Sequence, residues 1–392
     1  MRPFRVVHMS SVHSWKDPRI LLKQCASLAQ AGWEVHLVVA NGPGGTVDGV
    51  RIHVVPGAAG RLGRMTRTAF RVWRRALALD ADIYHLHDPE LVPWGLLLRA
   101  RGRRVVYDVH EDYVTGIAQA PYLPRPVARL AGRLYGALER LAAPAFDIVI
   151  AEAYYARRFP RGVPVLNHPR LDAFRDAAFD GREAPAGGVR LLYTGNVTEG
   201  RGALLHAAAL AALPDAHLHF AGRCPAALAE RIIRAAGGPE RVSFDGIDAY
   251  VPFERMLDTY RQPWTAALAL FPDSPHYREK ELTKLFEYMA AGLPLLCSDF
   301  PVWRRLVEGV GLTVDPTDPA AIAAAVARLH GDPALYRSLA RNGRHAAFER
   351  FDWAIQADRL AGLYRRMLRM DPPGLMPVLG STASSTKGQD AP

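Results

Sequence analysis

The sequence lacks long apolar runs and paired cysteines. Its most apolar segments, such as Leu91–Leu98, are far shorter than the ~18–20 residues that a membrane-spanning helix needs. The amino terminus has one short apolar run, broken by His8, so a signal peptide is not expected. Cys25, Cys224 and Cys297 are odd in number and far apart, which argues against a disulfide framework or a zinc site. We therefore expect a cytoplasmic protein.

Acidic residues are scarce in the first half of the chain. Residues 1–180 contain 25 Lys and Arg against 16 Asp and Glu, whereas the rest contains 24 against 23. This surplus accounts for nearly all of the net charge of +10. It predicts an anionic partner, such as a membrane surface, a phosphorylated acceptor or nucleic acid. An arginine-rich surface without a partner is the alternative.

One basic segment, 61–79, also carries apolar residues at helical spacing. Its six arginines precede any acidic residue, and its apolar members are Leu62, Met65, Phe70, Trp73 and Leu77. Such a segment predicts peripheral contact with an anionic membrane, at the inner face of the cell membrane for a cytoplasmic protein. A solvated helix face is the alternative. Nucleic acid is not expected, because no aromatic-interleaved binding motif is present.

The chain is long enough for two α/β domains. With 392 residues, 49% hydrophobic and 22% charged, it reads as globular. Strand-like and helix-like segments alternate, which predicts parallel sheets covered on both faces. We expect a first domain over 1–168, a second over 169–351, a final helix over 352–370 and a disordered tail over 371–392.

The predicted elements follow this alternation. In the first half, strands are expected at Phe4–His8, Glu34–Ala40, Ile52–Val55, Ile83–Leu86, Arg104–Asp108 and Ile148–Ala151, with helices at Pro18–Ala31, Arg61–Leu79, Leu91–Arg99 and Arg125–Ala142. In the second half, strands are expected at Arg190–Tyr193, His217–Ala221, Val242–Phe244, Ala266–Phe271 and Pro294–Ser298, with helices at Ala203–Ala212, Ala226–Ala236, Phe253–Tyr260, Lys284–Ala291, Pro319–His330, Pro333–Phe348 and Trp353–Met370.

The segment 279–299, EKELTKLFEYMAAGLPLLCSD, carries the clearest chemistry. Thr283 is a good N-cap for the predicted helix Lys284–Ala291. A helix amino terminus suits a diphosphate, and Lys284 beside it makes sense if an anion sits in front of it. Glu287, one turn further on, has the chemistry to accept hydrogen bonds from ribose hydroxyls. An ordinary exposed helix start is the alternative.

A second segment, 191–205, runs from a strand through a glycine turn into a helix. Arg201 stands at the opening of that helix, where a clamp on a diphosphate would lie. The glycines Gly195 and Gly202 are also ordinary turn residues, so this segment alone is a weak indication.

Together these motifs resemble a known family. Glu279 and Glu287 are separated by seven residues and followed by YMAAGLP, which resembles the signature of family-4 retaining glycosyltransferases of the GT-B fold. Segments 17–39, 84–98 and 106–113 resemble the bacterial polysaccharide-assembly branch of that family. The resemblance covers about residues 4–368. It implies two Rossmann-like domains that face each other across a cleft.

The resemblance also implies roles for individual residues. It implies catalytic roles for His110, Arg201 and Glu279. It implies donor contacts by Gly195, Asn196, Arg201, Gly222, Leu282, Thr283, Lys284 and Glu287. It suggests acceptor-side candidates at His13, Asp17, Arg19, His87 and Glu111. Two departures from the family stand out: Asn196 replaces a basic residue, and Ser10–His13 replaces a Gly-Gly loop.

The implied activity is transfer of a sugar from a UDP- or GDP-sugar to a hydroxyl, with retention of configuration and without a metal or other cofactor. The acceptor would be lipid-linked or a saccharide. Alternatives are a small natural-product acceptor, a non-hydrolysing nucleotide-sugar epimerase and a non-catalytic nucleotide-sugar binding protein.

Three further motifs have simpler explanations. The polar strand ends at His85–Asp88 and His110–Asp112 lie where any ligand of an α/β sheet binds, so a metal is not expected. Asp80 and Asp82 stand between a helix and a strand, where turn chemistry explains them. Gly42–Gly45 leads into a strand rather than a helix, which argues against a dinucleotide site.

Overall fold

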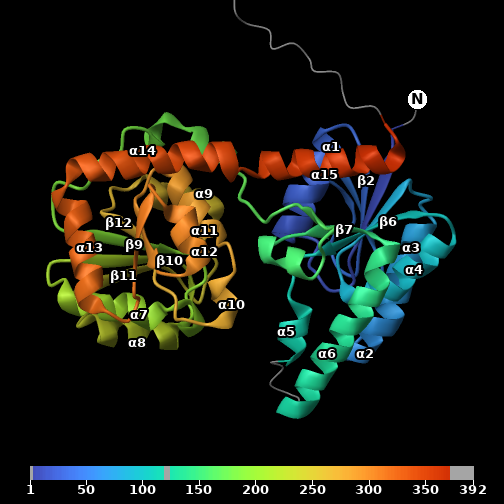
Figure 1. The fold of residues 1–392 in the computed structure, drawn as a ribbon, viewed down its shortest axis with the longest axis horizontal. Coiled ribbons are helices and arrows are strands. Elements are labelled where there is room, and N and C mark those ends of the chain that lie inside the picture. The colour runs from blue at the N-terminus through green and yellow to red at the C-terminus, as the bar shows by residue number, and fades with distance from the viewer. Residues whose placement is uncertain (1–2, 119–123, 371–392) are drawn as a thin grey trace, which may run out of the picture.

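The computed structural model describes residues 3–118 and 124–370, which form two α/β domains, each around its own sheet (Figure 1). The first sheet has eight strands in the order β3-β4-β2-β1-β5-β6-β7-β8. All its neighbouring pairs are parallel except β3 with β4. Its strands are β1 (Arg5–Met9), β2 (Glu34–Val39), β3 (Gly45–Val47), β4 (Val50–Val54), β5 (Ile83–Leu86), β6 (Arg104–Val109), β7 (Asp147–Ile150) and β8 (Val163–Pro164).

The helices of the first domain cover both faces of this sheet, which is why its central strands are buried throughout. They are the π-helix η1 (Pro18–Cys25), α1 (Ala26–Gln30), α2 (Gly60–Gly63), the π-helix η2 (Arg64–Thr68), α3 (Ala69–Leu77), α4 (Val92–Ala100), α5 (Tyr113–Ala118) and α6 (Arg125–Ala142). Short 3-10 turns lie at Pro89–Leu91, Ala143–Ala145 and Ala153–Arg157.

The second sheet has six parallel strands in the order β11-β10-β9-β12-β13-β14. They are β9 (Arg190–Thr194), β10 (His217–Cys224), β11 (Val242–Ile247), β12 (Ala266–Ala269), β13 (Leu295–Ser298) and β14 (Gly311–Val314). The helices of this domain are α7 (Ala203–Ala208), α8 (Ala226–Ala236), α9 (Phe253–Arg261), α10 (Pro275–Arg278), α11 (Thr283–Ala290), α12 (Pro301–Val307), α13 (Pro319–Gly331) and α14 (Pro333–Arg350). The 3-10 turns Asp172–Arg175, Ala177–Phe179, Glu199–Arg201, Ala209–Ala212 and Pro239–Arg241 complete it.

The last helix, α15 (Trp353–Leu368), returns to the first domain (Figure 1). It begins directly after α14, and its N-cap Asp352 accepts a hydrogen bond from the amide of Ala354 at 3.1 Å. The indole of Trp353 donates to Ser27 Oγ at 2.8 Å, and the Tyr364 hydroxyl lies 2.6 Å from Nδ1 of His85. Apolar residues of α15 complete the core on one face of the first sheet. The second domain is thereby joined to the first at both ends.

The predicted architecture of parallel α/β sheets is confirmed, and the local differences have physical reasons. The predicted helices Pro18–Ala31 and Arg61–Leu79 each contain a π-helical stretch, a feature that apolar spacing does not reveal. The sequence analysis missed the short edge strands β3 and β14, which offer too few residues for a pattern. The predicted tail 371–392 lies outside the described residues. Among the described residues, no helix is long and apolar enough to span a membrane.

Candidate active site

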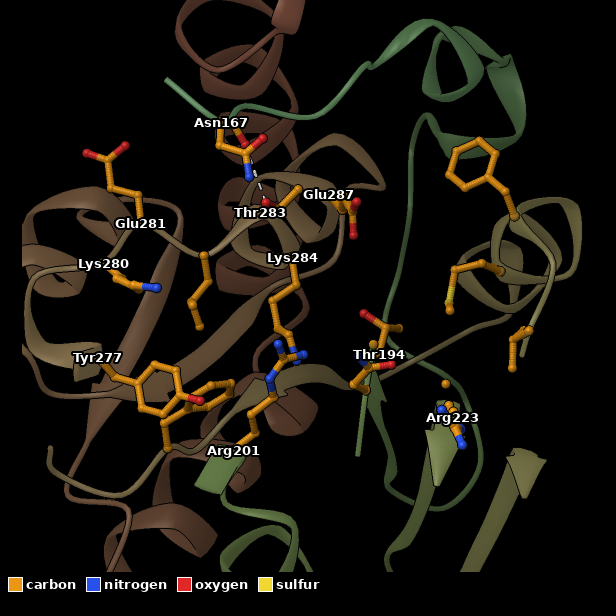
Figure 2. Close-up of a pocket in the computed structure, with 18 of the residues that line it drawn as sticks. Asn167, Thr194, Arg201, Arg223, Tyr277, Lys280, Glu281, Thr283, Lys284 and Glu287 are labelled. Atoms are coloured by element: carbon orange, nitrogen blue, oxygen red, sulfur yellow. Dashed lines mark hydrogen bonds between the residues drawn. The ribbon is translucent and has the colours of Figure 1, made fainter. Parts of the chain in front are cut away.

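A cavity of about 450 Å³ opens at the carboxyl ends of the second-domain strands (Figure 2). This is the usual position for a ligand in a parallel α/β sheet. The loops after β9 and β12, the end of β10 and the helices α9 and α11 form most of its wall, and Glu152 and Asn167 close it from the first-domain side. All eight predicted donor-contact residues line it: Gly195, Asn196, Arg201, Gly222, Leu282, Thr283, Lys284 and Glu287.

Two glycines let the cavity loops approach each other. Gly222 has φ 147°, and a side chain on it would collide with the carbonyl oxygen of Gly195. Gly202 has φ 77°, and a side chain there would collide with the carbonyl oxygen of Leu270 at the end of β12. Gly202 thus ends the turn that carries Arg201, and this close approach places Arg201 in the cavity wall.

Lys284 is the most unusual charge in the cavity. Its Nζ lies 3.6 Å from the centroid of the Tyr193 ring, and it has no hydrogen-bond partner among the described residues. Burial, reinforced by the neighbouring Arg201, lowers the pKa of Lys284 well below its ordinary value, against the opposing effect of Glu287. In Figure 2, Lys284 and Arg201 reach toward the same space. Because neither cation is neutralised by a hydrogen-bonded carboxylate in the described part of the chain, the space between them suits an anion.

Glu287 is held in place by a short polar chain. Its Oε2 accepts a hydrogen bond from the Tyr260 hydroxyl at 2.9 Å, and that hydroxyl lies 3.0 Å from Thr194 Oγ1 at the end of β9. Burial raises the pKa of Glu287 despite the hydrogen bond from Tyr260. The other carboxylate oxygen, Oε1, takes no part in these hydrogen bonds. A ligand hydroxyl in the cavity would therefore find a fixed acceptor at Glu287.

The start of α11 differs from the prediction. Thr283 was expected to cap the helix, but the N-cap residue is Leu282 and no side chain caps it. Thr283 is instead the first residue of the helix, and its hydroxyl donates to the carbonyl oxygen of Asn167 at 3.4 Å. The amino terminus of α11 therefore opens into the cavity without a side-chain acceptor of its own, which favours an anionic ligand.

Glu279, the residue expected to contact the donor sugar, lies outside the wall of this cavity. Its carboxylate forms a two-point ion pair with Arg157, at 3.1 and 3.0 Å, on the surface. It belongs to a neighbouring hollow that includes Asp273 and Arg278. The seven-residue spacing alone did not reveal that the loop before α11 turns this side chain away.

Lys280, Glu152 and Asn167 are among the residues that line the cavity but were not predicted from the sequence. Lys280 follows Glu279, and Figure 2 shows it reaching inward. Glu152 follows β7; its Oε2 accepts from the amide of Glu281 at 3.3 Å, and burial raises its pKa to about 7. Asn167 accepts a hydrogen bond from Lys23 at its side-chain oxygen. The position of Glu152 directly after a strand was the only available signal for it.

Asp88 organises the loop that replaces the family's Gly-Gly turn. Its carboxylate accepts from the Ser10 hydroxyl at 2.8 Å, from the amides of Ser11 and Val12 at 2.5 and 3.1 Å, and contacts His13 Nδ1 at 2.7 Å. Burial lowers the pKa of His13, but the hydrogen bonds to Asp88 and Glu111 outweigh it and raise the pKa to about 10. His13 and Glu111, two acceptor-side candidates, therefore form an ion pair, 3.7 Å apart, over the buried Asp88.

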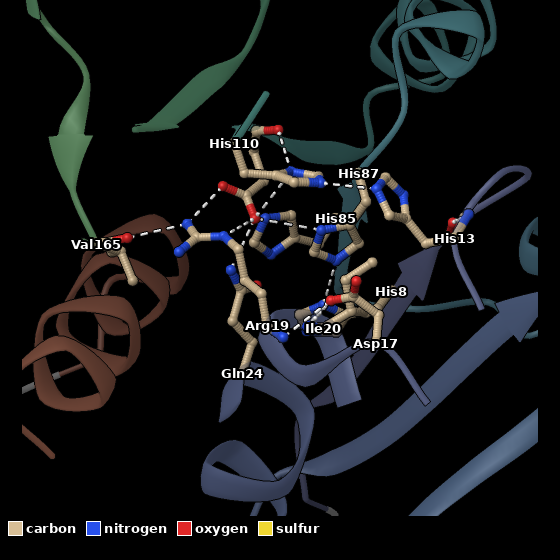
Figure 3. A network of polar contacts seen from close by, with 12 residues as sticks. His8, His13, Asp17, Arg19, Ile20, Gln24, His85, His87, His110 and Val165 are labelled. Atoms are coloured by element: carbon tan, nitrogen blue, oxygen red, sulfur yellow. Dashed lines mark hydrogen bonds and ion pairs between the residues drawn. The ribbon is translucent and has the colours of Figure 1, made fainter. Parts of the chain in front are cut away.

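The other first-domain candidates make polar contacts within their own domain (Figure 3). Arg19 pairs with both oxygens of Asp108, at 2.8 and 3.0 Å, and donates to the carbonyl oxygen of Val165. Asp17 caps η1 by accepting from the amides of Arg19 and Ile20. His87 is 1% exposed, and burial lowers its pKa to about 3 despite the neighbouring Asp108. Asp17 and Arg19 also line a cavity along the interdomain linker, whereas His87 is buried within its own sheet. The acceptor-side role of these three residues stays a prediction.

His110 also lies outside the wall of the cavity. Its Nδ1 is 3.1 Å from the Asp108 carbonyl oxygen and its Nε2 is 3.4 Å from His13 Nε2, so its ring is tied to the edge of its own sheet (Figure 3). Only 7% of the side chain is exposed. The first-domain wall of the cavity is formed by Glu152 and Asn167 instead. The expected role of His110 beside the donor stays a prediction.

Two groups of buried side chains in the first domain hold potential metal ligands close together. His8, His85 and His87, and separately His87, Asp108 and His110, bring ligand atoms within 4.8 Å of one another. However, Arg19 already neutralises Asp108, and an added cation would be repelled by it. Asp80 and Asp82 also serve the fold, since Asp80 pairs with Arg103 and Asp82 accepts from the amide of Arg5.

A second cavity, of about 590 Å³, adjoins the first along the interdomain linker. The two share Asn167, Phe253, Thr283 and Glu287. Lys23 lines it, and burial, together with Arg19, lowers the pKa of Lys23 to about 7 against the effect of Glu287. The carboxylate of Glu287 thus stands between one lysine from each domain.

The fold and this cavity define a class: an enzyme with two facing parallel-sheet domains of the GT-B type. Solved structures share the fold over nearly the whole chain. Sucrose-phosphate synthase from Thermosynechococcus elongatus is 20% identical with a TM-score of 0.70, covering 93% of this chain and 99% of its own. A glycosyltransferase from Rickettsia africae is 12% identical with a TM-score of 0.70, covering 94% and 100%. The Anabaena protein HepE in complex with UDP is 13% identical with a TM-score of 0.67, covering 93% and 100%.

Sequence families identify the two domains. Residues 19–161 match the family described as Glycosyltransferase Family 4, and residues 188–332 match the family described as Glycosyl transferases group 1. No curated protein is similar enough in sequence to count as a match. The protein is therefore a glycosyltransferase built from these two domains.

Proposed function

We propose that the protein transfers a sugar from a UDP- or GDP-sugar to an acceptor hydroxyl, with retention of configuration, in the assembly of a polysaccharide or another glycoconjugate. The observation that carries this proposal is the buried, unpartnered ammonium of Lys284 beside Arg201 and the uncapped start of α11. A diphosphate would supply the missing negative charge. Structures of HepE with UDP and with UDP-glucose support UDP-sugars as the first donors to test.

In the proposed reaction, the bond between the sugar C1 and the diphosphate oxygen breaks, and its electron pair stays on the nucleoside diphosphate. Arg201, Lys284 and the α11 amides would stabilise the charge that develops there. The acceptor oxygen bonds to C1 on the same face, and its proton passes to the departing phosphate oxygen. Glu287 would hold the ribose. This scheme needs no metal, so chelation with EDTA should leave turnover unchanged.

We further propose that the protein works at the cytoplasmic face of a membrane, on a lipid-linked or saccharide acceptor. The basic segment around α2 and α3 supports this proposal. Leu62 and Met65 expose 76% and 52% of their surface there, beside arginines. An anionic bilayer matches both the apolar and the charged residues.

Donor binding tests the proposal first. Thermal unfolding with UDP-, GDP- and dTDP-sugars should show a rise in melting temperature for one base only, because a ligand of the native state stabilises it. The selected donor is then incubated with and without a panel of acceptors that includes lipid-linked sugars, saccharides and small aglycones. Acceptor-dependent release of nucleoside diphosphate, with a product of unchanged anomeric configuration by NMR, is expected. Conversion of the donor to another nucleotide sugar without acceptor would overturn the proposal.

A further inference from the structure

Helix α6 exposes a row of large apolar side chains, here called the α6 ridge. Its members are between 51% and 79% exposed: Val127, Leu130, Leu134, Leu138 and Leu141. They recur every three or four residues, so they share one face of the helix. In Figure 1, α6 lies at the end of the first domain opposite α15.

The helix presents its large residues to solvent and its small ones to the protein. The buried residues of its inner face are Ala128, Gly132, Gly136 and Ala142, together with Glu139. Gly136 packs so closely against α5 that an added Cβ would lie 3.2 Å from Val114 Cγ2. Packing within the domain therefore uses none of the leucines, although burial is what apolar side chains normally gain from folding.

The charges around the α6 ridge are of one sign. Exposed arginines flank it: Arg125, Arg129, Arg133 and Arg140. Glu139, the only acidic residue of α6, is buried, where it accepts from the Tyr107 hydroxyl at 2.8 Å and pairs with Arg158 at 2.7 Å. Pairing of two α6 ridges would bring arginine against arginine, so the charges oppose a second copy and favour an anionic partner.

The apolar surface continues onto neighbouring helices. Helix α4 packs against α6 and exposes Leu96 and Leu97, and α3 packs against α4 and exposes Phe70. A broad apolar face ringed by arginine, rather than a single groove, suits a lipid bilayer better than a peptide.

We propose that the α6 ridge inserts into the interface of an anionic bilayer, with its arginines on the lipid phosphates. This deepens the proposed function by naming the membrane-binding surface, and it does not depend on which sugar is transferred. The α6 ridge itself lies on a different helix from the basic segment 61–79, although the apolar surface reaches Phe70 of that segment.

Vesicle sedimentation of the full chain tests the proposal. We expect the protein to bind vesicles of phosphatidylglycerol and phosphatidylcholine in equal parts, and to bind pure phosphatidylcholine weakly. Leu130→Gln/Leu134→Gln/Leu138→Gln should lower partition at least about tenfold, since glutamine keeps the helix propensity while removing apolar surface. Leu62→Gln/Met65→Gln measures the share of the other segment.

Charge is tested by a matched pair of variants. Arg129→Gln/Arg133→Gln should lower binding to anionic vesicles about tenfold or more at low salt, whereas Arg234→Gln/Arg328→Gln, exposed arginines of the second domain, should not. All variants should keep the donor-induced rise in melting temperature, which separates this test from that of the proposed function. Wild-type binding by the triple leucine variant, no vesicle binding by the wild type, or a dimer that the triple variant disperses would each overturn the proposal.

Discussion

The two domains treat their buried charges in opposite ways. In the first domain, Asp108 is satisfied on both oxygens by Arg19 and also accepts from Gln24. In the second, the ammonium of Lys284 is buried with no hydrogen-bond partner. A buried charge that is fully paired serves the fold, whereas an unpaired one is costly and persists where a ligand completes it. The contrast supports the proposal that the charge of the substrate binds in the second domain.

The helix starts show the same difference. Asp17 caps η1 by accepting from two amides, so that end has no free capacity for an anion. Helix α11 begins in the cavity without a side-chain cap. Uncapped amides and the helix dipole favour negative charge, so the start of α11 can bind an anion whereas the start of η1 cannot. The first domain offers instead an ordered acidic and imidazole cluster around Asp88.

The largest expected effect comes from Arg201. Arg201→Ala should lower kcat/KM for the selected donor by about 10²–10³-fold, because it removes a preorganised cation from the charge that develops on the diphosphate. Steady-state kinetics of nucleoside diphosphate release measure this. Arg234→Ala, at an exposed position of α8, is the control and should stay at the wild-type rate. A loss of less than about threefold in Arg201→Ala would break the contrast between the domains, since any single oxyanion-type donor should contribute more.

Lys284 tests the idea that the free site carries an unfavourable charge. Lys284→Met should abolish the donor-induced rise in melting temperature and leave the free protein as stable as the wild type or more stable. Burial lowers the pKa of Lys284 in the folded state, so the cost of burying its charge falls as pH rises toward the ordinary lysine value of 10.5. The difference in stability between the wild type and Lys284→Met should therefore narrow as pH rises toward 10.5.

The exposed Lys16 supplies the control for that variant. Lys16→Met should change neither quantity. If Lys284→Met destabilised the free protein by several kcal/mol while donor binding survived, Lys284 would be structural and the proposed diphosphate site would lie elsewhere.

The sequence predicted the second domain better than the first for a physical reason. Strand, turn and helix start are contiguous in the segments around Arg201 and Lys284, so local pattern alone places both at the end of a sheet. In the first domain, the residues that close the cavity, Glu152 and Asn167, follow different strands, and only the folded sheet brings them together. The sequence showed which polar residues lie at strand ends. Whether each is exposed depends on side chains from other segments, such as Asp88, that bind it in the fold.

Side-chain direction was the other quantity that the sequence did not contain. Glu279 and Glu287 have the seven-residue spacing of the family motif, but the spacing does not fix where each side chain points. The loop before α11 turns Glu279 toward Arg157, and the helix turns Glu287 into the cavity. The π-helical stretches in η1 and η2 were similarly invisible to an apolar pattern that does not distinguish helix types. The alternation of strands and helices, which depends on burial alone, was predictable throughout both domains.

His13 tests whether a paired buried charge stabilises the first domain. His13→Gln should lower the free energy of unfolding by about 2 kcal/mol at pH 6, because it removes a charged hydrogen bond to buried Asp88. The folded-state pKa of His13 is raised to about 10, so this contribution is complete below the ordinary value of 6.5 and disappears as pH rises through about 10.

Denaturant unfolding at pH 6, 8 and 10 measures the trend. His345→Gln, whose wild-type side chain is 72% exposed beside Glu349, is the control and should cost less than about 1 kcal/mol. An equal loss at all three pH values would show that His13 acts by packing rather than by charge.

The smallest expected effect concerns the loop before α11, where Lys280 lines the cavity and Glu279 belongs to the sequence motif. Lys280→Met should lower kcat/KM about tenfold, because its side chain lines the cavity, while Trp303 holds its backbone oxygen at 2.7 Å and keeps the loop in place. Glu279→Gln should stay within about threefold of the wild type, since it removes only an exposed ion pair with Arg157. The same kinetic assay compares the two variants directly. If Glu279→Gln lost more activity than Lys280→Met, the glutamate spacing would be the better guide, and the loop would have to turn Glu279 inward when the donor binds.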